Sequence, residues 1–168
     1  MSDILADATE LDLRDVLSEA YATAKRACMD RRQRLILTVP RNPVWVNGDF
    51  ASLRQVIEDL LESASKHTEP GGRIRLSLKE VSGRAAVQVT HSGIALTPRM
   101  ITKLFSCSNQ LHGFPPGERR RLNRVRRCVD LHGGSIEAGG KGPRRSAHFT
   151  LRLPLAVHEG PLQPRHGE

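Results

Sequence analysis

The sequence predicts an α+β domain, a two-layer α/β sandwich in which a mixed, mainly antiparallel sheet is covered on one face by about three helices. Three observations predict this fold. Residues 53–64 carry one continuous apolar stripe at helical spacing. Residues 73–90 divide into two strand-like runs that are joined at Ser82 and Gly83, which is the pattern of a hairpin. Helical spacing returns at 118–131 and is followed by two further strand-like runs.

The elements expected before residue 70 are a short strand at 10–13, a helix from 12 to about 31, strands at 34–39 and 44–47, and a helix from 49 to 66. Asp12 and Asp49 stand at the two helix starts, where a carboxylate accepts hydrogen bonds from free backbone N–H groups. The second helix is the clearest element, because its apolar residues share one face: Leu53, Val56, Ile57, Leu60, Leu61 and Ala64. Its opposite face is polar and is expected to be solvated: Glu58, Asp59, Glu62, Ser63 and Lys66.

The elements expected after residue 70 are strands at 73–81 and 84–90, a short helix at 97–105, a loop at 106–117, a helix at 118–131 and closing strands at 135–138 and 148–153. In the last helix we expect Leu122, Val125 and Val129 to point inward. The chain of 168 residues is expected to form one domain at 10–155, with a flexible leader at 1–9 and a disordered tail at 156–168.

Composition favours a protein of the cytoplasm. No apolar run is long enough to span a bilayer, and the N-terminus lacks the pattern of a secretory signal, so we expect a soluble, cytosolic chain without a membrane segment. The three cysteines, Cys28, Cys107 and Cys128, are widely spaced and odd in number. This pattern argues against a disulfide framework or a zinc site, and reduced thiols are expected.

Charge is unevenly distributed along the chain. The first 69 residues are net acidic and the remainder is strongly basic, which gives a net charge of +8. A basic half can attract nucleic acid, acidic proteins or phosphate groups. Aromatic residues are few, at one Trp, one Tyr and four Phe, so platforms for base stacking are poorly supplied and nucleic acid is not the expected partner.

Three segments in order carry a resemblance to a known family: SLRQVIEDLLESASKHTEPGG from Ser52, HSGIAL at 91–96 and LHGGSIEA at 131–138. They resemble the N box, the G1 box and the end of the G2-box helix in the ATP-binding domain of sensor histidine kinases. That domain belongs to the superfamily shared with gyrase and mismatch-repair ATPases. The resemblance extends from about residue 11 to 155 and implies a Bergerat-type ATPase fold. It also implies ATP and Mg²⁺ as cofactors, if the nucleotide site is functional.

In the N box the family's Mg²⁺-binding Asn corresponds to Ser63, and its other Asn to Asp59. These two residues are one helical turn apart, so a metal site led by the Asp59 carboxylate is conceivable, although a hydroxyl is a weaker Mg²⁺ ligand. The alternative, which we favour, is a solvated helix face with a pair between Glu62 and Lys66. The resemblance implies that Lys66 approaches phosphate. The family has an aromatic residue where this chain has His67.

In the G1 box the family's adenine-binding Asp corresponds to His91. A neutral imidazole has one acceptor nitrogen, so adenine contact is conceivable but lacks the charge of a carboxylate. Gly93 matches the first family glycine, which lets the chain pass close to the base. The second family glycine corresponds to Ala95, whose Cβ disfavours positive φ.

The G2 box departs most from the family. Its glycine-rich turn, whose backbone amides hold phosphates at a helix N-terminus, corresponds to GERRRLN. Gly117 remains, but the inner glycines correspond to Arg119 and Arg121, whose side chains obstruct close approach of a phosphate to the backbone. The arginines either form a surface run or direct guanidinium groups toward a polyanion.

These departures favour a degenerate ATPase domain that acts in two-component signalling without catalysis. Its expected partner is a kinase, a phosphotransfer protein or a response regulator, and no bound cofactor is expected. The alternative is an ATP-binding kinase domain that phosphorylates a histidine on another domain or chain. No histidine with the family's phosphoacceptor pattern is present, so phosphorylation in cis is not expected. A third, less favoured class is an anion-binding module that uses the arginines at 119–127.

Overall fold

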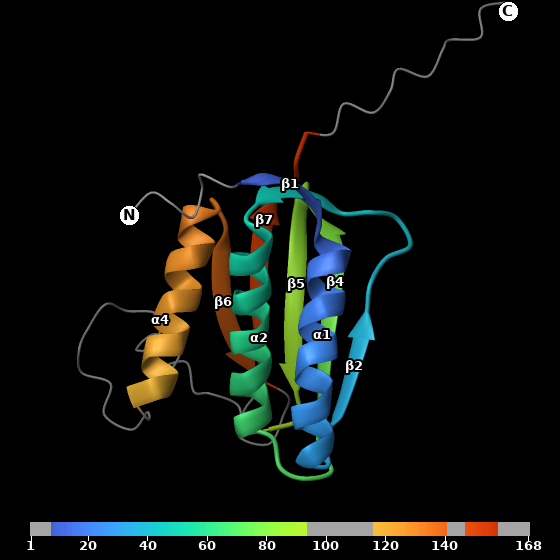
Figure 1. The fold of residues 1–168 in the computed structure, drawn as a ribbon, viewed down its shortest axis with the longest axis vertical. Helices are drawn as coiled ribbons and strands as arrows, with labels where there is room; N and C mark the ends of the chain where they lie inside the picture. Colours follow the sequence, from blue (N-terminus) through green and yellow to red (C-terminus); the bar gives the residue numbers. More distant parts are fainter. Residues whose placement is uncertain (1–7, 94–115, 141–146, 158–168) are drawn as a thin grey trace, which may run out of the picture.

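The computed structural model describes residues 8–93, 116–140 and 147–157. In these residues three helices lie on one face of a five-stranded sheet (Figure 1). The helices are α1 (Leu13–Asp30), α2 (Phe50–Lys66) and α4 (Pro116–Leu131). The strands are β1 (Thr9–Asp12), β2 (Arg34–Thr38), β3 (Trp45–Gly48), β4 (Arg73–Val81), β5 (Arg84–His91), β6 (Ser135–Gly140) and β7 (Ala147–Pro154). The α+β sandwich predicted from the sequence is confirmed.

The large sheet has the strand order β2-β4-β5-β7-β6. Strands β2 and β4 are parallel, while each other neighbouring pair is antiparallel, so the sheet is mixed and mainly antiparallel as expected. The predicted hairpin joins β4 to β5, and its turn residues Ser82 and Gly83 both have positive φ. Side chains alternate along each strand, so one side of the sheet faces the helices and the other faces outward.

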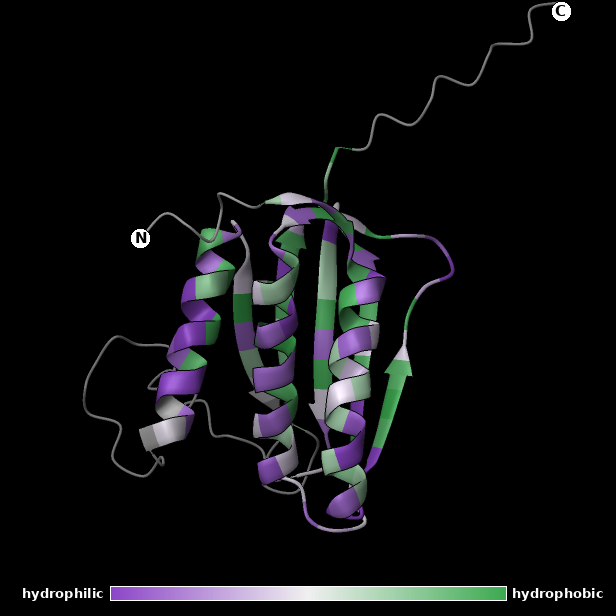
Figure 2. Ribbon diagram, in the orientation of Figure 1, coloured by the Kyte–Doolittle hydropathy of each residue, from purple (hydrophilic) through white to green (hydrophobic). Residues whose placement is uncertain are grey.

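Helix α2 is the central helix of the layer and lies between α1 and α4 (Figure 1). Its N-cap is Asp49, whose carboxylate accepts from the backbone N–H of Ser52 at 3.0 Å. The predicted apolar stripe is buried, with no member more than 2% exposed: Leu53, Val56, Ile57, Leu60, Leu61 and Ala64. The outward surfaces of α2 and α4 are mainly hydrophilic in Figure 2. The core therefore lies between the helix layer and the sheet, as the stripe predicts.

A separate two-stranded sheet closes one end of the core. Strand β1 pairs antiparallel with β3, so that Leu11 lies opposite Val46. The sequence predicted one sheet, and this detail is wrong. The physical reason is that Pro40 and Pro43 interrupt the chain between β2 and β3 and have no N–H group to extend a ladder.

The LHGG segment joins the end of α4 to the start of α2. His132 Nε2 accepts from the backbone N–H of Asp49 at 3.1 Å, and His132 Nδ1 lies 2.7 Å from the carbonyl oxygen of Cys128. Because Nε2 is the acceptor, Nδ1 carries the proton and donates to that carbonyl. A Cβ at Gly48 would lie 2.8 Å from the His132 ring, so this contact requires a glycine there. The two sequence segments, far apart in the chain, thus form one structural brace.

Helix α4 begins earlier than the sequence predicted. It starts at Pro116 rather than Glu118, because proline has a preset helical φ and needs no N–H partner in the first turn. The expected short helix at 97–105, and residues 106–115 of the expected loop, lie outside the described residues. The boundaries of the leader and the tail stay predictions.

Replacing Leu60 with Ala is expected to lower the free energy of unfolding by about 2–5 kcal/mol, because Leu60 is 1% exposed and its loss leaves a cavity in the core. Urea denaturation of both proteins measures this difference. The matched control is Val81→Ala, where the residue is 51% exposed and the change is expected to stay within about 0.5 kcal/mol. A cost for Leu60→Ala below about 1 kcal/mol would contradict the packing of α2.

Candidate functional site

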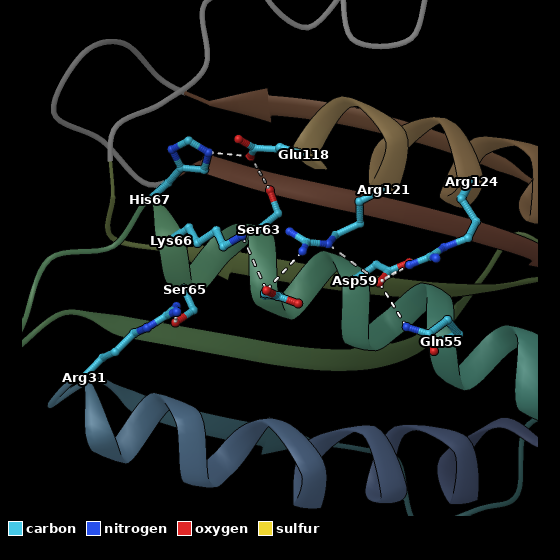
Figure 3. Close-up of polar contacts among 11 residues, drawn as sticks. Arg31, Gln55, Asp59, Ser63, Ser65, Lys66, His67, Glu118, Arg121 and Arg124 are labelled. Atoms are coloured by element: carbon cyan, nitrogen blue, oxygen red, sulfur yellow. Dashed lines mark hydrogen bonds and ion pairs between the residues drawn. The ribbon is translucent and has the colours of Figure 1, made fainter. Parts of the chain in front are cut away.

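The candidate site is the interface between α2 and α4. Asp59 and Ser63, the two positions matched to the family's metal and phosphate chemistry, lie on the side of α2 that faces α4 (Figure 3). Helix α4 presents Glu118, Arg121 and Arg124 toward them from successive turns (Figure 3). The site thus depends on the packing of two helices that are distant in the sequence.

Asp59 is buried and held by two arginines. Arg124 donates to both carboxylate oxygens, with Nε at 3.1 Å from Oδ2 and Nη2 at 2.9 and 2.8 Å from Oδ1 and Oδ2. Gln55 Nε2 donates to Oδ1 at 3.0 Å, and Arg121 Nε lies 3.8 Å away. The side chain of Asp59 is only 4% exposed, whereas that of Arg124 is 60% exposed. The carboxylate is therefore neutralised within the protein by cations that reach it from the surface.

Ser63 and His67 share one carboxylate from α4. Ser63 Oγ donates to Glu118 Oε1 at 3.1 Å, and His67 Nε2 lies 2.6 Å from the same oxygen. Glu118 is itself buried, and its place between the two α2 residues is seen in Figure 3. The hydroxyl that corresponds to the family's Mg²⁺ ligand is thus used as a donor to Glu118.

The contact between His67 and Glu118 shifts the pKa values of both side chains. The hydrogen bond to Glu118 raises the pKa of His67 above 6.5, against the opposing effect of burial. The hydrogen bond to His67 lowers the pKa of Glu118 below 4.5, again against burial. The pair is therefore a charge-assisted hydrogen bond between imidazolium and carboxylate at mildly acidic pH.

The expectation of a solvated polar face on α2 is wrong for Asp59 and Ser63, which are 3% and 1% exposed. Helix α4 covers them, and the sequence of α2 gave no sign of that cover. The same packing corrects the interpretation of the arginines as a surface run, because Arg121 and Arg124 bind α2. The rest of the face does follow the expectation: Lys66 Nζ lies 3.5 Å from Glu62 Oε1, and both side chains are more than 40% exposed.

The guanidinium group of Arg121 lies between the carboxylates of Asp59 and Glu62. Its Nη2 lies 3.0 Å from Glu62 Oε1, and its Nη1 is buried with no hydrogen-bond partner among the described residues. The position matched to an inner family glycine therefore holds a guanidinium group that packs on α2. Gly117, in the first turn of α4, is exposed, and the side chain of Arg119 lies outside the described residues.

His91 is buried at the end of β5 and is neutral. Burial lowers its pKa to about 4, with a smaller contribution from His67. Its Nδ1 accepts from the backbone N–H of Gly93 at 3.3 Å and lies 3.3 Å from the hydroxyl oxygen of Thr68. Because Nδ1 accepts, the tautomer that fits carries its proton on Nε2, and the imidazole presents a donor at its other nitrogen.

Gly93 is required by packing against α2. A Cβ at this position would lie 1.9 Å from the carbonyl oxygen of His67, at the C-cap of that helix. The glycine that the resemblance assigns to the nucleotide thus also has a structural role. Ala95, the other matched position in this segment, lies outside the described residues.

Sequence reasoning missed Glu118, Arg124 and the role of His67. Glu118 was placed only as a helix start, although it directly follows Gly117 in the altered G2 box and can reach α2. Arg124 was expected only as one of the arginines at 119–127, and the sequence did not indicate that it pairs with Asp59. In the described residues no group of three His, Cys, Asp or Glu side chains is placed to hold a metal ion.

The family is shown by comparison with known proteins. Residues 48–157 match the model of the family described as histidine kinase-, DNA gyrase B-, and HSP90-like ATPase, and the chain belongs to this family. The adaptive-response sensory kinase SasA of Parasynechococcus marenigrum is 30% identical over 94% of this chain and 42% of its own length. The sensor protein DivL of Caulobacter vibrioides is 26% identical over 99% of this chain and 22% of its own length. The chain thus spans less than half the length of these curated relatives.

Solved structures confirm the fold. The catalytic domain of histidine kinase ThkA, in a nucleotide-free form, superposes with a TM-score of 0.78 at 21% identity, covering 88% of this chain and 95% of that domain. Full-length ShkA in complex with AMPPNP also gives 0.78 at 21% identity, covering 93% of this chain and 33% of that protein. In the described residues no helix is long and apolar enough to cross a bilayer.

Replacing Arg124 with Ala is expected to lower the free energy of unfolding by about 1–3 kcal/mol, because it leaves the buried Asp59 carboxylate with weaker partners. Thermal and urea denaturation measure the change. The control is Arg120→Ala on the same helix, an exposed residue whose loss is expected to cost less than about 0.5 kcal/mol. Equal effects of the two variants would contradict the role of the Asp59–Arg124 pair.

The pair of His67 and Glu118 predicts a pH dependence. The raised pKa of His67 means that its contribution is complete below pH 6.5 and is lost as the pH rises through the folded-state pKa. The lowered pKa of Glu118 means that its contribution is complete above pH 4.5 and is lost as the pH falls through the folded-state pKa. The pair is therefore fully formed between pH 4.5 and 6.5.

An NMR titration of the His67 ring tests this prediction. In the wild type we expect a midpoint above 6.5, and in Glu118→Gln a lower midpoint, because burial then acts without the carboxylate. His91 serves as an internal reference, since its pKa of about 4 keeps it neutral over the same range. An unchanged His67 midpoint in the variant would show that Glu118 does not control the ring.

Proposed function

We propose that this chain is a histidine-kinase-type ATPase domain that has lost or weakened ATP binding and acts in two-component signalling as a non-catalytic interaction or regulatory module. One observation carries the proposal. The α2 groups matched to the family's metal and phosphate chemistry, Asp59 and Ser63, are engaged by Arg124 and Glu118 from α4. A metal ion or a nucleotide that bound at Asp59 and Ser63 would therefore have to displace Arg124 and Glu118.

The charges at this interface argue against a bound Mg²⁺·phosphate group. Mg²⁺ prefers oxygen ligands in a near-octahedral arrangement, whereas Asp59 is bound by guanidinium groups and Ser63 donates its proton to Glu118. Glu118 adds a buried carboxylate beside Ser63, and a phosphate placed there would meet like charge. In this arrangement the residues do not fit the metal.

His91 argues in the same direction for the base. The family's Asp accepts a hydrogen from the adenine amino group, whereas Nδ1 of His91 already accepts from Gly93. The remaining nitrogen is a donor in that tautomer, so it presents the wrong polarity to an amino group. The proposal is therefore supported at both the phosphate end and the base end of the matched positions.

The second candidate is an active ATP-binding kinase domain that phosphorylates a histidine on another domain or chain. It is favoured by Arg121, whose Nη1 is buried without a partner among the described residues, and by Lys66, which is held by Glu62 at the surface. These two cations lie on facing helices. Both are paired with Glu62, so displacement of Glu62 by a nucleotide phosphate would leave both free to bind that phosphate. The matched positions Gly93, Ala95, Gly117 and Arg119 would then line the nucleotide.

The proposed partner is a protein of the same signalling class: a kinase, a phosphotransfer protein or a response regulator. The structure of histidine kinase ThkA has been solved in complex with the response regulator protein TrrA. ThkA in that complex is similar in fold to this chain. The cytoplasm is the proposed location, in agreement with the free, buried thiols of Cys28 and Cys128.

Calorimetric titration with ATP·Mg²⁺ tests the function. We expect no binding at millimolar nucleotide, with ADP and GTP alongside and the salt concentration varied. Full-length ShkA, which has been solved in complex with AMPPNP, serves as the positive control. Tight binding that selects adenine and requires Mg²⁺ would overturn the proposal in favour of the kinase.

A gain-of-binding variant sharpens the result. Ser63→Asn combined with Arg119→Gly and Arg121→Gly restores the family residues at the metal position and in the glycine-rich turn. If these departures are what abolishes binding, the variant is expected to bind ATP·Mg²⁺ more tightly than the wild type. The matched control keeps Ser63→Asn and replaces the two arginines with Lys, which retains the charge and the bulk.

A further inference from the structure

The outward face of the large sheet is not covered by any element of the described residues. The helices occupy the opposite face (Figure 1), and strand register fixes which side chains point outward. On β4 the outward residues alternate with buried ones and are Arg73, Arg75, Ser77 and Lys79. In the register, Ser77 and Arg75 lie opposite Gln88 and Thr90 of β5.

A hollow of about 390 Å³ lies on this face and is lined mainly by polar side chains. Those of Ser77, Gln88 and Thr90 are partly buried, whereas those of Arg73, Arg75 and Lys79 are exposed. The hollow therefore combines hydroxyl and amide groups with three flexible cations.

Within the described part of the chain, no acidic side chain neutralises the cations of this face. None of the ion pairs formed among the described residues involves Arg73, Arg75 or Lys79. Glu137 of β6 lies two strands beyond β5, at the far edge of the sheet, and is already paired with Arg152 of the adjacent β7. In addition, Arg34 of β2 lies directly opposite Arg73, an arrangement of like charges that destabilises a sheet. A surface that carries this cost is expected to gain from a bound anion.

We propose that this outward face docks an acidic segment of a protein partner. Carboxylates complement the three cations in charge and accept hydrogen bonds from guanidinium, ammonium, hydroxyl and amide groups alike. The inference names the partner chemistry of the docking role proposed above and rests on that role. It assigns the docking surface to the sheet, on the side of the fold opposite the α2–α4 site.

Nucleic acid and a lipid surface fit this face less well. Of the aromatic residues in the described part of the chain, Tyr21, Trp45 and Phe50 lie on α1, β3 and α2, and Phe149 is buried in the core, so bases have no platform to stack on. Among the described residues, Val81 is the exposed large hydrophobic side chain in the strands of this sheet, which provides no apolar face to enter a membrane.

The test uses a fluorescein-labelled oligoglutamate peptide, with the corresponding oligoglutamine peptide as the uncharged reference. Binding is followed by fluorescence anisotropy at several salt concentrations. The sheet variant Arg75→Glu/Lys79→Glu is compared with Arg26→Glu/Arg120→Glu, which changes the net charge equally at exposed residues of α1 and α4. We expect the sheet variant to bind oligoglutamate at least about tenfold more weakly than the helix variant. Thermal denaturation of both variants confirms that they are folded.

Amide chemical shifts of the wild type locate the contact. We expect oligoglutamate to perturb Ser77, Gln88 and Thr90 more than the residues of α4. Equal loss of binding in the two variants, or perturbation centred on α4, would overturn the assignment to the sheet. Tighter binding of a double-stranded DNA, or of vesicles that contain phosphatidylserine, at the same face would replace the protein partner by that class of ligand.

The ATP·Mg²⁺ titration separates this inference from the proposed function. Adenine-selective binding of ATP overturns the non-catalytic role, whichever variant binds the peptide. Absence of both nucleotide and peptide binding leaves the non-catalytic role standing and overturns the docking surface alone.

Discussion

The burial of helix α2 on two sides is the constraint on which the rest of the structure depends. Its apolar stripe fills the space against the sheet, and Leu53, Ile57 and Leu60 are at most 1% exposed. Its polar side is covered by α4, so Asp59 and Ser63 are buried as well. A buried polar group without a partner costs free energy, and α4 must therefore carry residues that satisfy this side.

The partners that α4 supplies explain its register. Arg124 binds Asp59 with two nitrogens, and Glu118, farther toward the N-terminus, accepts from Ser63 and from His67. Buried ion pairs add little net stability once desolvation is counted, but a buried charge without its partner is costly. These pairs therefore favour the one placement of α4 along α2 in which each charge meets its partner. At the other end of the helix the His132 brace fixes α4 to the start of α2. Contacts at both ends hold the helix in one alignment.

This alignment separates two surfaces with different chemistry. On the helix side, charged groups meet each other and are neutralised within the protein. On the sheet side, Arg73, Arg75 and Lys79 face outward around a hollow and have no ion-pair partners among the described residues. Two of the matched positions, Asp59 and Ser63, are thus engaged by Arg124 and Glu118, while the opposite face presents positive charge that the described residues do not neutralise. The proposed docking role follows from that contrast.

The sequence alone determined the elements and their faces, because periodicity, caps and turn residues are local signals. The α2 stripe, the β4–β5 hairpin and the N-cap residues Asp12 and Asp49 are confirmed, as is the family, whose motifs are also local in sequence. Tertiary structure decided what each polar side chain touches. Asp59 and Arg124 are 65 positions apart, and no periodicity links them. The separate β1–β3 sheet and the burial of Ser63 likewise depend on how distant segments pack, since burial is a property of the neighbours and not of the residue itself.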